Sequence, residues 1–262
     1  MAKGDNPGVP YAGALRPLAE VNSEPAEKTL IRVVWLLNEV VKRVTRREWY
    51  DQDKIPRTGG VVIVVNHISN LDPLVIGQFL AYAGRWPRYL GKASLFKIPV
   101  IGRIITACGQ IPVERNTRNA KRALAQAIEA VNQGKSITVF PEGTITFDPE
   151  LWPMVAKTGA ARIALESSVP VIPIGHWGAQ DIMGAKKIRF PRLFPRRTLS
   201  VKAGEPVDLD DLRTQPVTPA LLKEATLRTM SAITDLVADL RGEVPPPQPF
   251  DPRARPETGD SP

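Results

Sequence analysis

Cysteine, histidine and long apolar runs are all scarce in this 262-residue sequence, and their scarcity excludes several classes of protein. The single cysteine, Cys108, cannot close a disulfide within the chain, and no Cys/His cluster has the spacing of a structural zinc site. The first 25 residues lack the apolar core of a signal peptide. We therefore expect a protein of the reducing cytoplasm rather than a secreted, disulfide-linked one.

No segment is apolar for long enough to cross a bilayer. The strongest candidate, residues 30–44, is interrupted by three basic residues, Asn38 and Glu39, whereas a spanning helix needs about 20 mostly apolar residues. A membrane-spanning helix is therefore not expected.

The chain has instead a surplus of positive charge, with a formal net charge of +8 and a sequence pI of about 9.7. A net positive charge of this size predicts an acidic partner. The candidates are anionic lipid, a phosphorylated substrate and nucleic acid. Aromatic residues make up only 6% of the chain and none of the usual nucleic-acid-reading motifs occurs, so nucleic acid is disfavoured.

Basic and apolar residues are mixed in two stretches, residues 28–47 and 186–197. We expect the first to form an amphipathic helix over residues 26–50, which lies on an anionic membrane surface or packs on the protein's own core. The second has the same mixture of basic and aromatic residues and is expected to contact the membrane.

The pattern along the chain predicts one α/β domain over residues 26–242. Apolar, β-branched strands at 61–67, 136–140 and 171–174 alternate with helical periodicity, which favours a largely parallel or mixed central sheet flanked by helices. Residues 1–25 and 243–262 are rich in Gly and Pro without periodicity, and we expect both to be flexible tails.

Polar residues follow two of these strands where their apolar runs end, in NHISNLD (66–72) and FPEGT (140–144). Ligands of open α/β sheets bind beyond the carboxyl ends of the strands, so the two loops are expected to face one site. His67 and Asp72 together suit a general base, because the carboxylate fixes the tautomer and stabilises the imidazolium. The alternative is that Asp72 only caps the next helix. His176 is assigned no acid partner, and we expect it to be structural or peripheral.

A Gly-x-Ser-x-Gly nucleophile elbow is absent, which disfavours a covalent serine enzyme. The base would then activate a hydroxyl group of the substrate, or water.

Four blocks in this order resemble the 1-acyl-glycerol-3-phosphate acyltransferase family. They are the His67-to-Asp72 spacing, residues 92–102 leading to IPVER at 111–115, FPEGT at 140–144, and VIPI at 171–174. The resemblance covers about residues 55–180, and four ordered blocks are more specific than any one of them. It implies a single acyltransferase domain.

The resemblance implies that His67, oriented by Asp72, removes the proton of the glycerol hydroxyl. That hydroxyl then attacks an acyl thioester, either acyl-CoA or acyl carrier protein, without an acyl-enzyme, a metal or a cofactor. Arg115, Glu142 and Gly143 match positions that hold the glycerol phosphate, and Glu142 suits the glycerol hydroxyl or Arg115 better than the phosphate.

Other residues are assigned to the same substrate site. Thr144 belongs to the same motif, and Lys92 and Lys157 match basic positions of the family, although either is equally compatible with an ordinary solvated lysine. Glu114 stands where many relatives have an aspartate, which weakens the assignment of its neighbourhood.

The sequence thus predicts a peripheral enzyme at the cytoplasmic face of the cell membrane, which makes phosphatidic acid from a lysophospholipid and an acyl thioester. One alternative keeps the reaction but changes the acceptor to a lyso-glycolipid, such as a phosphatidylinositol mannoside, or to glycerol-3-phosphate. Another is a non-catalytic lipid-binding protein, against which the intact His67 and Asp72 argue. The oligomeric state is not indicated.

Overall fold

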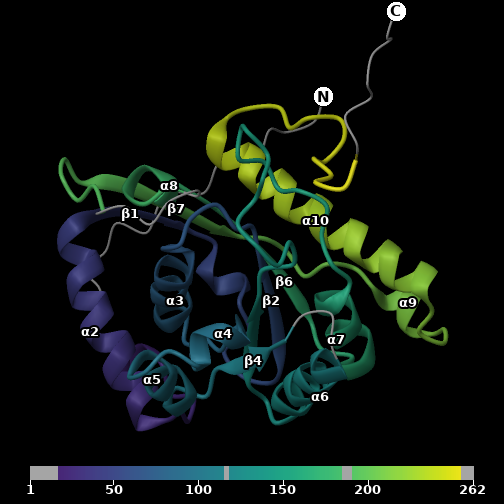
Figure 1. Ribbon diagram of the computed structural model, residues 1–262, viewed down its shortest axis with the longest axis horizontal. Coiled ribbons are helices and arrows are strands. Elements are labelled where there is room, and N and C mark those ends of the chain that lie inside the picture. The colour runs from purple at the N-terminus through teal and green to yellow at the C-terminus, as the bar shows by residue number, and fades with distance from the viewer. Residues whose placement is uncertain (1–16, 115–117, 185–190, 255–262) are drawn as a thin grey trace, which may run out of the picture.

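A computed structural model describes residues 17–114, 118–184 and 191–254, and its core is a five-stranded sheet in the order β1-β7-β6-β2-β5 (Figure 1). All neighbouring strands are parallel except β6 and β7. The predicted largely parallel sheet is thereby confirmed. A second, two-stranded sheet pairs β3 with β4. The strands are β1 (Thr45–Tyr50), β2 (Val61–Val65), β3 (Leu90–Lys92), β4 (Ile111–Val113), β5 (Ser136–Val139), β6 (Val171–Trp177) and β7 (Arg197–Ala203).

Helices cover both faces of the sheet, and β2 shows why the sequence requires this. Val62 and Val64 point into one core, whereas Val61, Ile63 and Val65 point into the other, and all five are fully buried. An uninterrupted apolar strand is stable only where both of its faces are covered.

One core lies under α6, α7 and α10, and the other lies under α3, with α2 packed outside α3 (Figure 1). The longer helices are α2 (Lys28–Val44), α3 (Asp72–Tyr82), α5 (Ile101–Ala107), α6 (Arg118–Asn132), α7 (Gly159–Ser167) and α10 (Pro219–Arg241). The short ones are α1 (Leu18–Val21), η1 (Gln52–Lys54), α4 (Ala93–Phe96), α8 (Ala179–Ile182) and α9 (Asp210–Arg213).

The amphipathic N-terminal helix is shorter than predicted, because residues 45–50 form strand β1. This segment lies parallel to β7, which supplies hydrogen-bonding partners for its backbone. The carbonyl groups at the end of α2 are satisfied by the Thr45 hydroxyl, which donates to Val41, and by the Arg196 guanidinium, which donates to Lys42 and Arg43. The predicted helix over 26–50 is therefore wrong for its last six residues.

The predicted N-terminal tail is wrong over residues 17–25, which pack against the domain. Leu18 is buried, and the Glu24 carboxylate accepts hydrogen bonds from the guanidinium groups of Arg85 and Arg88 at 3.3 and 2.9 Å. Both arginines are almost completely buried and need a carboxylate nearby. A forecast from composition alone misses this pairing, because the two arginines lie about 60 residues further along the chain.

The predicted C-terminal tail is likewise wrong over residues 243–254. The segment folds back across the domain, where the Val155 amide donates to the Phe250 carbonyl at 3.0 Å. The prolines suit such a segment because they bring no backbone N–H that would need an acceptor. Residues 255–262 lie outside the described part of the chain.

Candidate active site

The loops that follow β2 and β5 meet at one edge of the sheet, as the sequence predicts. The two strands are parallel neighbours, with Val61 level with Ser136. Beyond their ends, the Thr146 amide donates to the His67 carbonyl at 2.8 Å, and the His67 amide donates to Glu142 Oε1 at 2.9 Å. Residues 66–72 and 140–146 therefore lie against each other, as expected, and a common substrate site at this edge stays a prediction.

His67 and Asp72 form a hydrogen-bonded pair at this edge. The distance between His67 Nδ1 and Asp72 Oδ2 is 2.7 Å, and the side chain of His67 is 17% exposed whereas that of Asp72 is fully buried. With Nδ1 donating to a carboxylate, the ring is held in the tautomer whose Nε2 carries the lone pair. The pair therefore has the geometry of an oriented general base.

Asp72 is fixed by the loop before it rather than acting as a helix cap. Its Oδ2 also accepts hydrogen bonds from the amides of Ile68 and Ser69 at 2.7 and 2.8 Å, and the N-cap of α3 is Leu71. Burial alone would raise the pKa of Asp72, but the neighbouring His176, and then His67, lower that pKa below its ordinary value. The carboxylate is therefore ionised where His67 needs it.

His176 does have an acidic neighbour, contrary to the expectation from sequence. Its ring is fully buried, and its Nε2 lies 3.5 Å from Asp72 Oδ2 and 3.1 Å from the Asn66 carbonyl oxygen. The Asn66 side-chain amide in turn bonds the backbone N–H and carbonyl of His176 at 3.0 and 3.1 Å. Because β6 is the other parallel neighbour of β2, its end reaches the same edge of the sheet.

Glu142 connects His67, just after the end of β2, to residues 152–158, called here the 152–158 loop. Its Oε1 accepts from the His67 amide and its Oε2 accepts from the Met154 amide at 3.1 Å. Burial raises the pKa of Glu142 to about 8; the two amides oppose this rise, and Asp72 adds to it. Its predicted role toward the substrate stays a prediction, and here backbone donors occupy both oxygens.

Gly143 turns the chain so that Lys157 can lie against it. Gly143 has φ of +74°, and a Cβ at this position would lie 3.3 Å from the Cδ and Cε atoms of Lys157. The Lys157 amide donates to the Pro141 carbonyl at 2.9 Å, and its side chain is exposed. Thr144 is partly exposed in the same turn. These three predicted residues therefore lie together beside Glu142.

Of the other two predicted basic residues, the structure describes only Lys92, which is not joined to the His67–Asp72 pair, called here the dyad. Lys92 is exposed at the end of β3, level with Val113 of β4, and the described contacts do not join it to His67 or Asp72. Arg115 lies outside the described residues.

Phe140 lies at the site, although no pattern in the sequence assigns it a role. Its ring stacks on the His67 ring, with centroids 4.4 Å apart and an angle of 25°, and the Tyr89 ring stacks beyond it at 6.0 Å. The only signal in the sequence is its place at the start of FPEGT, directly after a strand.

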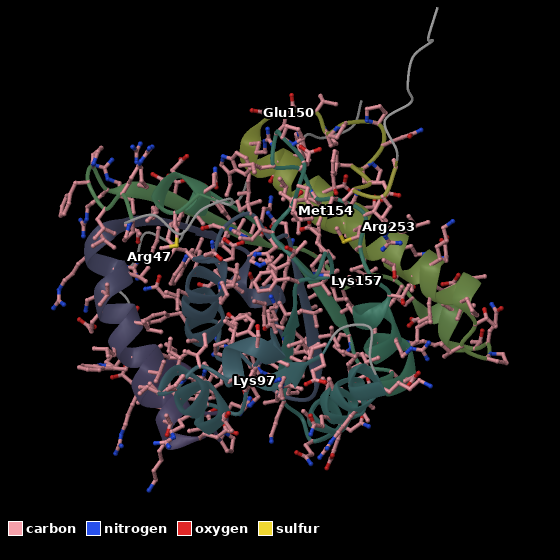
Figure 2. All side chains as sticks on the ribbon, viewed as in Figure 1. Arg47, Lys97, Glu150, Met154, Lys157 and Arg253 are labelled. Carbon is pink, nitrogen blue, oxygen red and sulfur yellow. The ribbon has the colours of Figure 1, made fainter. Side chains whose placement is uncertain are left out.

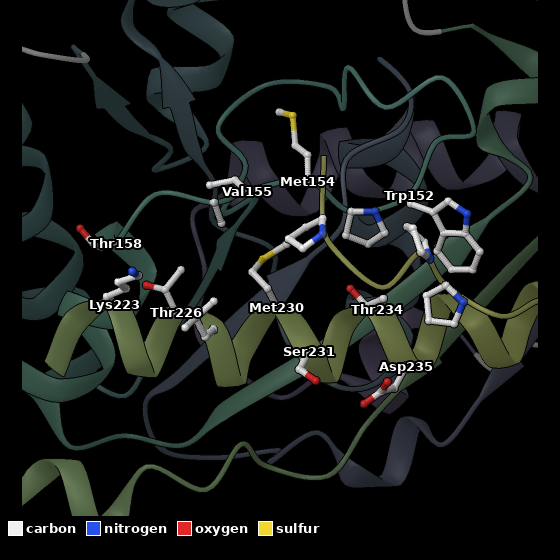
Figure 3. A pocket seen from close by; sticks show the side chains of 16 residues that line it. Trp152, Met154, Val155, Thr158, Lys223, Thr226, Met230, Ser231, Thr234 and Asp235 are labelled. Atoms are coloured by element: carbon white, nitrogen blue, oxygen red, sulfur yellow. The ribbon is translucent and has the colours of Figure 1, made fainter. Parts of the chain in front are cut away.

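Two apolar cavities lie near this constellation. One, of about 380 Å³, lies between the 152–158 loop, α10 and the prolines of the C-terminal segment, as Figure 3 shows from close by. The other, of about 200 Å³, lies between α2, α3 and α5 and has Pro73 and Tyr89 in its wall. The rings of Tyr89 and Phe140 connect the wall of the second cavity to His67, because Tyr89 stacks on Phe140 and Phe140 stacks on His67.

Comparison with known proteins yields one family. A family model described as Acyltransferase matches residues 46–177. The chain is 33% identical over 124 residues to a 1-acyl-sn-glycerol-3-phosphate acyltransferase of Borreliella burgdorferi, which covers 47% of each chain. It is 37% identical over 123 residues to a chloroplast enzyme of that name from Brassica napus, covering 47% of this chain and 34% of the relative. The chain thus spans half or less of the length of these relatives.

The fold also matches a solved structure. The crystal structure of the 1-acyl-sn-glycerophosphate acyltransferase from Thermotoga maritima aligns with a TM-score of 0.63 and 24% identity, over 84% of each chain. At this identity the likeness establishes the architecture, namely a mixed α/β fold with a mostly parallel sheet flanked by helices.

Proposed function

Because the chain belongs to the acyltransferase family, we propose that it transfers a fatty acyl group from an acyl thioester to the free glycerol hydroxyl of 1-acyl-glycerol-3-phosphate, which gives phosphatidic acid. The observation that carries this proposal is the His67–Asp72 pair, hydrogen-bonded at 2.7 Å at the partly exposed edge of the sheet. The names of the aligned relatives support the choice of acceptor.

In the proposed mechanism, His67 Nε2 takes the proton of the glycerol hydroxyl as that oxygen attacks the thioester carbonyl carbon. Asp72 stabilises the imidazolium that forms. The tetrahedral intermediate collapses, the carbon–sulfur bond breaks, and the imidazolium returns the proton to the thiolate that leaves. One ester and one thiol are formed, with no covalent enzyme intermediate and no metal or cofactor in the scheme.

The phosphate of the acceptor needs cationic partners close to His67. Lys157 is proposed for this role because its exposed side chain lies over Gly143, next to Glu142. Arg115 and Lys92 are proposed as further partners of the phosphate, on the basis of the sequence motif alone.

The acyl chain needs an apolar space that opens near the dyad. The cavity of about 200 Å³ between α2, α3 and α5 meets this need, because Tyr89 in its wall belongs to the ring stack on His67. We therefore assign the acyl chain of one substrate to it.

A membrane surface is the proposed place of action. Apolar side chains are exposed on α2 and on residues 95–104, among them Trp35 and Val100 at 58% and 65%. Basic residues lie beside them on α2, as anionic lipid would favour. Within the described part of the chain, no helix is both long and apolar enough to cross a bilayer. We place the enzyme peripherally at the cytoplasmic face, where its thioester donors occur.

The test is thiol release from palmitoyl-CoA by the purified full chain, with lysophosphatidic acid, glycerol-3-phosphate, a lyso-glycolipid or no acceptor, in wild type and His67→Ala. We expect release that depends on lysophosphatidic acid and falls by a factor of about a hundred or more in the variant. Palmitoyl-acyl carrier protein in a parallel assay identifies the donor.

The other outcomes separate the alternatives. Thiol release with only a different acceptor would support the role of His67 and Asp72 but would show that the acceptor is not lysophosphatidic acid. Equal release by wild type and a folded His67→Ala would refute the general base. No release with any acceptor or donor, from protein that still binds vesicles, would favour a lipid-binding protein.

A further inference from the structure

A third cavity, of about 680 Å³, lies between α1 and α2, at the end of α3 opposite to the dyad. Tyr82, the last residue of α3, contributes to its wall, whereas Asp72 is the first residue of the same helix. An 11-residue helix is about 16 Å long, so this cavity is remote from the dyad. Its wall shares one residue, Asn38, with the cavity assigned above to the acyl chain. Figure 2 likewise shows Arg47, from the wall of this cavity, in a different part of the molecule from Met154 and Lys157.

The wall of the cavity carries more positive than negative charge. Arg32, Lys42 and Arg47 line it, and the one carboxylate in its wall, Glu39, is paired with Lys42 at 2.5 Å. The two basic stretches of the sequence also meet here, because Arg196 donates to the backbone carbonyl of Lys42 at 2.9 Å. The surplus of cations fits an anionic ligand.

Arg47 in particular lacks a counter-charge. Its side chain is partly buried, its Nη1 is shielded from solvent without a hydrogen-bonding partner, and no described carboxylate lies within ion-pair distance. Burial lowers the pKa of Arg47, Tyr82 opposes this and Arg196 adds to it. The guanidinium carbon lies 5.2 Å from the centre of the Trp49 ring, which favours a cation but supplies no hydrogen-bond acceptor for Nη1. A shielded N–H group without an acceptor is costly, and a phosphate is the anion that best matches the forked donors of a guanidinium.

The same cavity has an apolar rim. Trp35 and Ile31 line it and are 58% and 38% exposed. A free phosphate would leave this rim unused, whereas a phospholipid places acyl chains beside its phosphate. We propose that the cavity binds the phosphate headgroup of an anionic phospholipid, at a site distinct from the catalytic one.

The test compares two neighbouring arginines on β1. Arg47→Gln and Arg46→Gln remove the same charge, but Arg46 is exposed and does not line the cavity. Binding of the full chain is measured by co-sedimentation with vesicles of phosphatidylcholine, with and without phosphatidylglycerol. Non-specific attraction is worth about 1 kcal/mol per basic residue, which is about fivefold in affinity. We expect Arg46→Gln to lose about fivefold or less and Arg47→Gln about twentyfold or more, only when phosphatidylglycerol is present.

An equal loss in the two variants, or no loss in Arg47→Gln, would overturn the proposal in favour of general surface charge. If Arg47→Gln does not fold, Arg32→Gln and Arg43→Gln form a second matched pair on α2, because only Arg32 lines the cavity. Inorganic phosphate is added at constant ionic strength as a competitor, and complete displacement by it would replace the lipid with free phosphate as the ligand.

Acyl transfer to a short-chain, soluble lysophosphatidic acid provides an independent readout. It should be the same in wild type and Arg47→Gln, since the cavity is remote from His67. Failure of the headgroup site is therefore distinguishable from failure of the proposed acyl transfer.

Discussion

The ends of β2 and β6 each bring a histidine to Asp72, but only one of the two rings is open to a substrate. The side chain of His67 is 17% exposed and donates to the carboxylate at 2.7 Å. The His176 ring is fully buried, at 3.5 Å from the same oxygen, and also contacts the Asn66 carbonyl. The difference suggests a division of roles, in which His67 moves the proton and His176 helps to keep the carboxylate charged and in place.

The comparison also shows that spacing alone does not identify a catalytic pair. Asp72 follows His67 by five residues, and Asp181 follows His176 by the same number. Yet Asp181 is exposed in α8, whereas His176 faces Asp72. The loop after β2 folds back so that its amides and the carboxylate meet, and no such hydrogen bonds to Asp181 are found among the described residues.

The largest expected effect is that of Asp72→Asn, which removes the charge shared by both histidines. We expect the turnover rate to fall by about a hundredfold to ten-thousandfold, because an amide can hold His67 in the wrong tautomer. The measurement is acceptor-dependent thiol release. Asp181→Asn is the matched control, with the same chemical change at the same spacing, and it should leave the rate unchanged. A comparable loss of rate in Asp72→Asn and Asp181→Asn would contradict the assignment of Asp72 as the partner of His67.

Asp72→Asn should also change how the free energy of unfolding depends on pH. The folded pKa of Asp72 is lower than that of the unfolded chain, so its charge stabilises the fold above the ordinary pKa of an aspartate, and this contribution is lost as the pH falls through the folded pKa. The difference in unfolding free energy between wild type and Asp72→Asn should therefore stay constant from pH 7 down to the ordinary pKa of an aspartate, about 3.9, and shrink as the pH falls further. A constant difference would mean that Asp72 acts through packing alone.

Glu142→Gln should have the second largest effect, because both carboxylate oxygens accept backbone N–H groups. The amide of glutamine must turn its NH₂ toward His67 N or Met154 N, which leaves a buried donor facing another donor. We expect the rate to fall by about tenfold to a hundredfold. Glu150→Gln is a matched control, because Glu150 is exposed in the segment that leads to the 152–158 loop.

Stability measurements sharpen this prediction, since the folded pKa of Glu142 is raised to about 8. The folded state then holds a proton that the unfolded state has lost above the ordinary pKa of a glutamate. The contribution of Glu142 to the free energy of unfolding is therefore largest below the ordinary pKa of a glutamate. It declines as the pH rises to about 8, at no more than about 1.4 kcal/mol per pH unit. The decline should be missing in Glu142→Gln. An identical slope in both proteins would show that Glu142 ionises normally.

The sequence alone predicts the pairing of His67 with Asp72 but not the contact of His176 with the same carboxylate. The β-branched strand predicted over 61–67, the His67-to-Asp72 spacing and the FPEGT turn are local signals. The strand is observed over 61–65, and the other two lie where they were expected. The partnership of His176 depends on the order of strands in the sheet, which no local pattern reveals.

The errors at the ends of the domain have the same physical origin. Strand β1 and the segments 17–25 and 243–254 are ordered by partners far away in sequence, such as β7 and the buried arginines of residues 85–88. Local composition describes what a segment can do alone, and these segments do not act alone.

His176→Leu should have a smaller effect, about tenfold on the rate, because it removes a supporting contact rather than the base. His176→Gln should recover much of the loss, since its amide can still donate toward the Asn66 carbonyl. Loss of the imidazole removes an interaction that lowers the pKa of Asp72, so the acid side of the activity profile should move to higher pH. Asp72 also interacts electrostatically with His67, Glu142 and the buried Tyr89. These three groups are the same in the wild type and in the variants, so they do not change the comparison. A loss of rate that is equal at every pH would indicate packing only.

The smallest effect should come from Phe140→Leu, which leaves the dyad's hydrogen bonds intact. Leucine fills much of the same volume but removes the flat surface that lies 4.4 Å from the His67 ring. A stacked pair is worth about 0.5–1.5 kcal/mol, so the rate should fall by about twofold to tenfold while the Michaelis constant for the acceptor stays unchanged. Phe147→Leu, on an exposed phenylalanine of the same loop, is the control and should be silent. If Phe140→Leu instead raised the Michaelis constant at an unchanged rate, the ring would bind the substrate rather than orient His67, because orientation of the base affects only the chemical step.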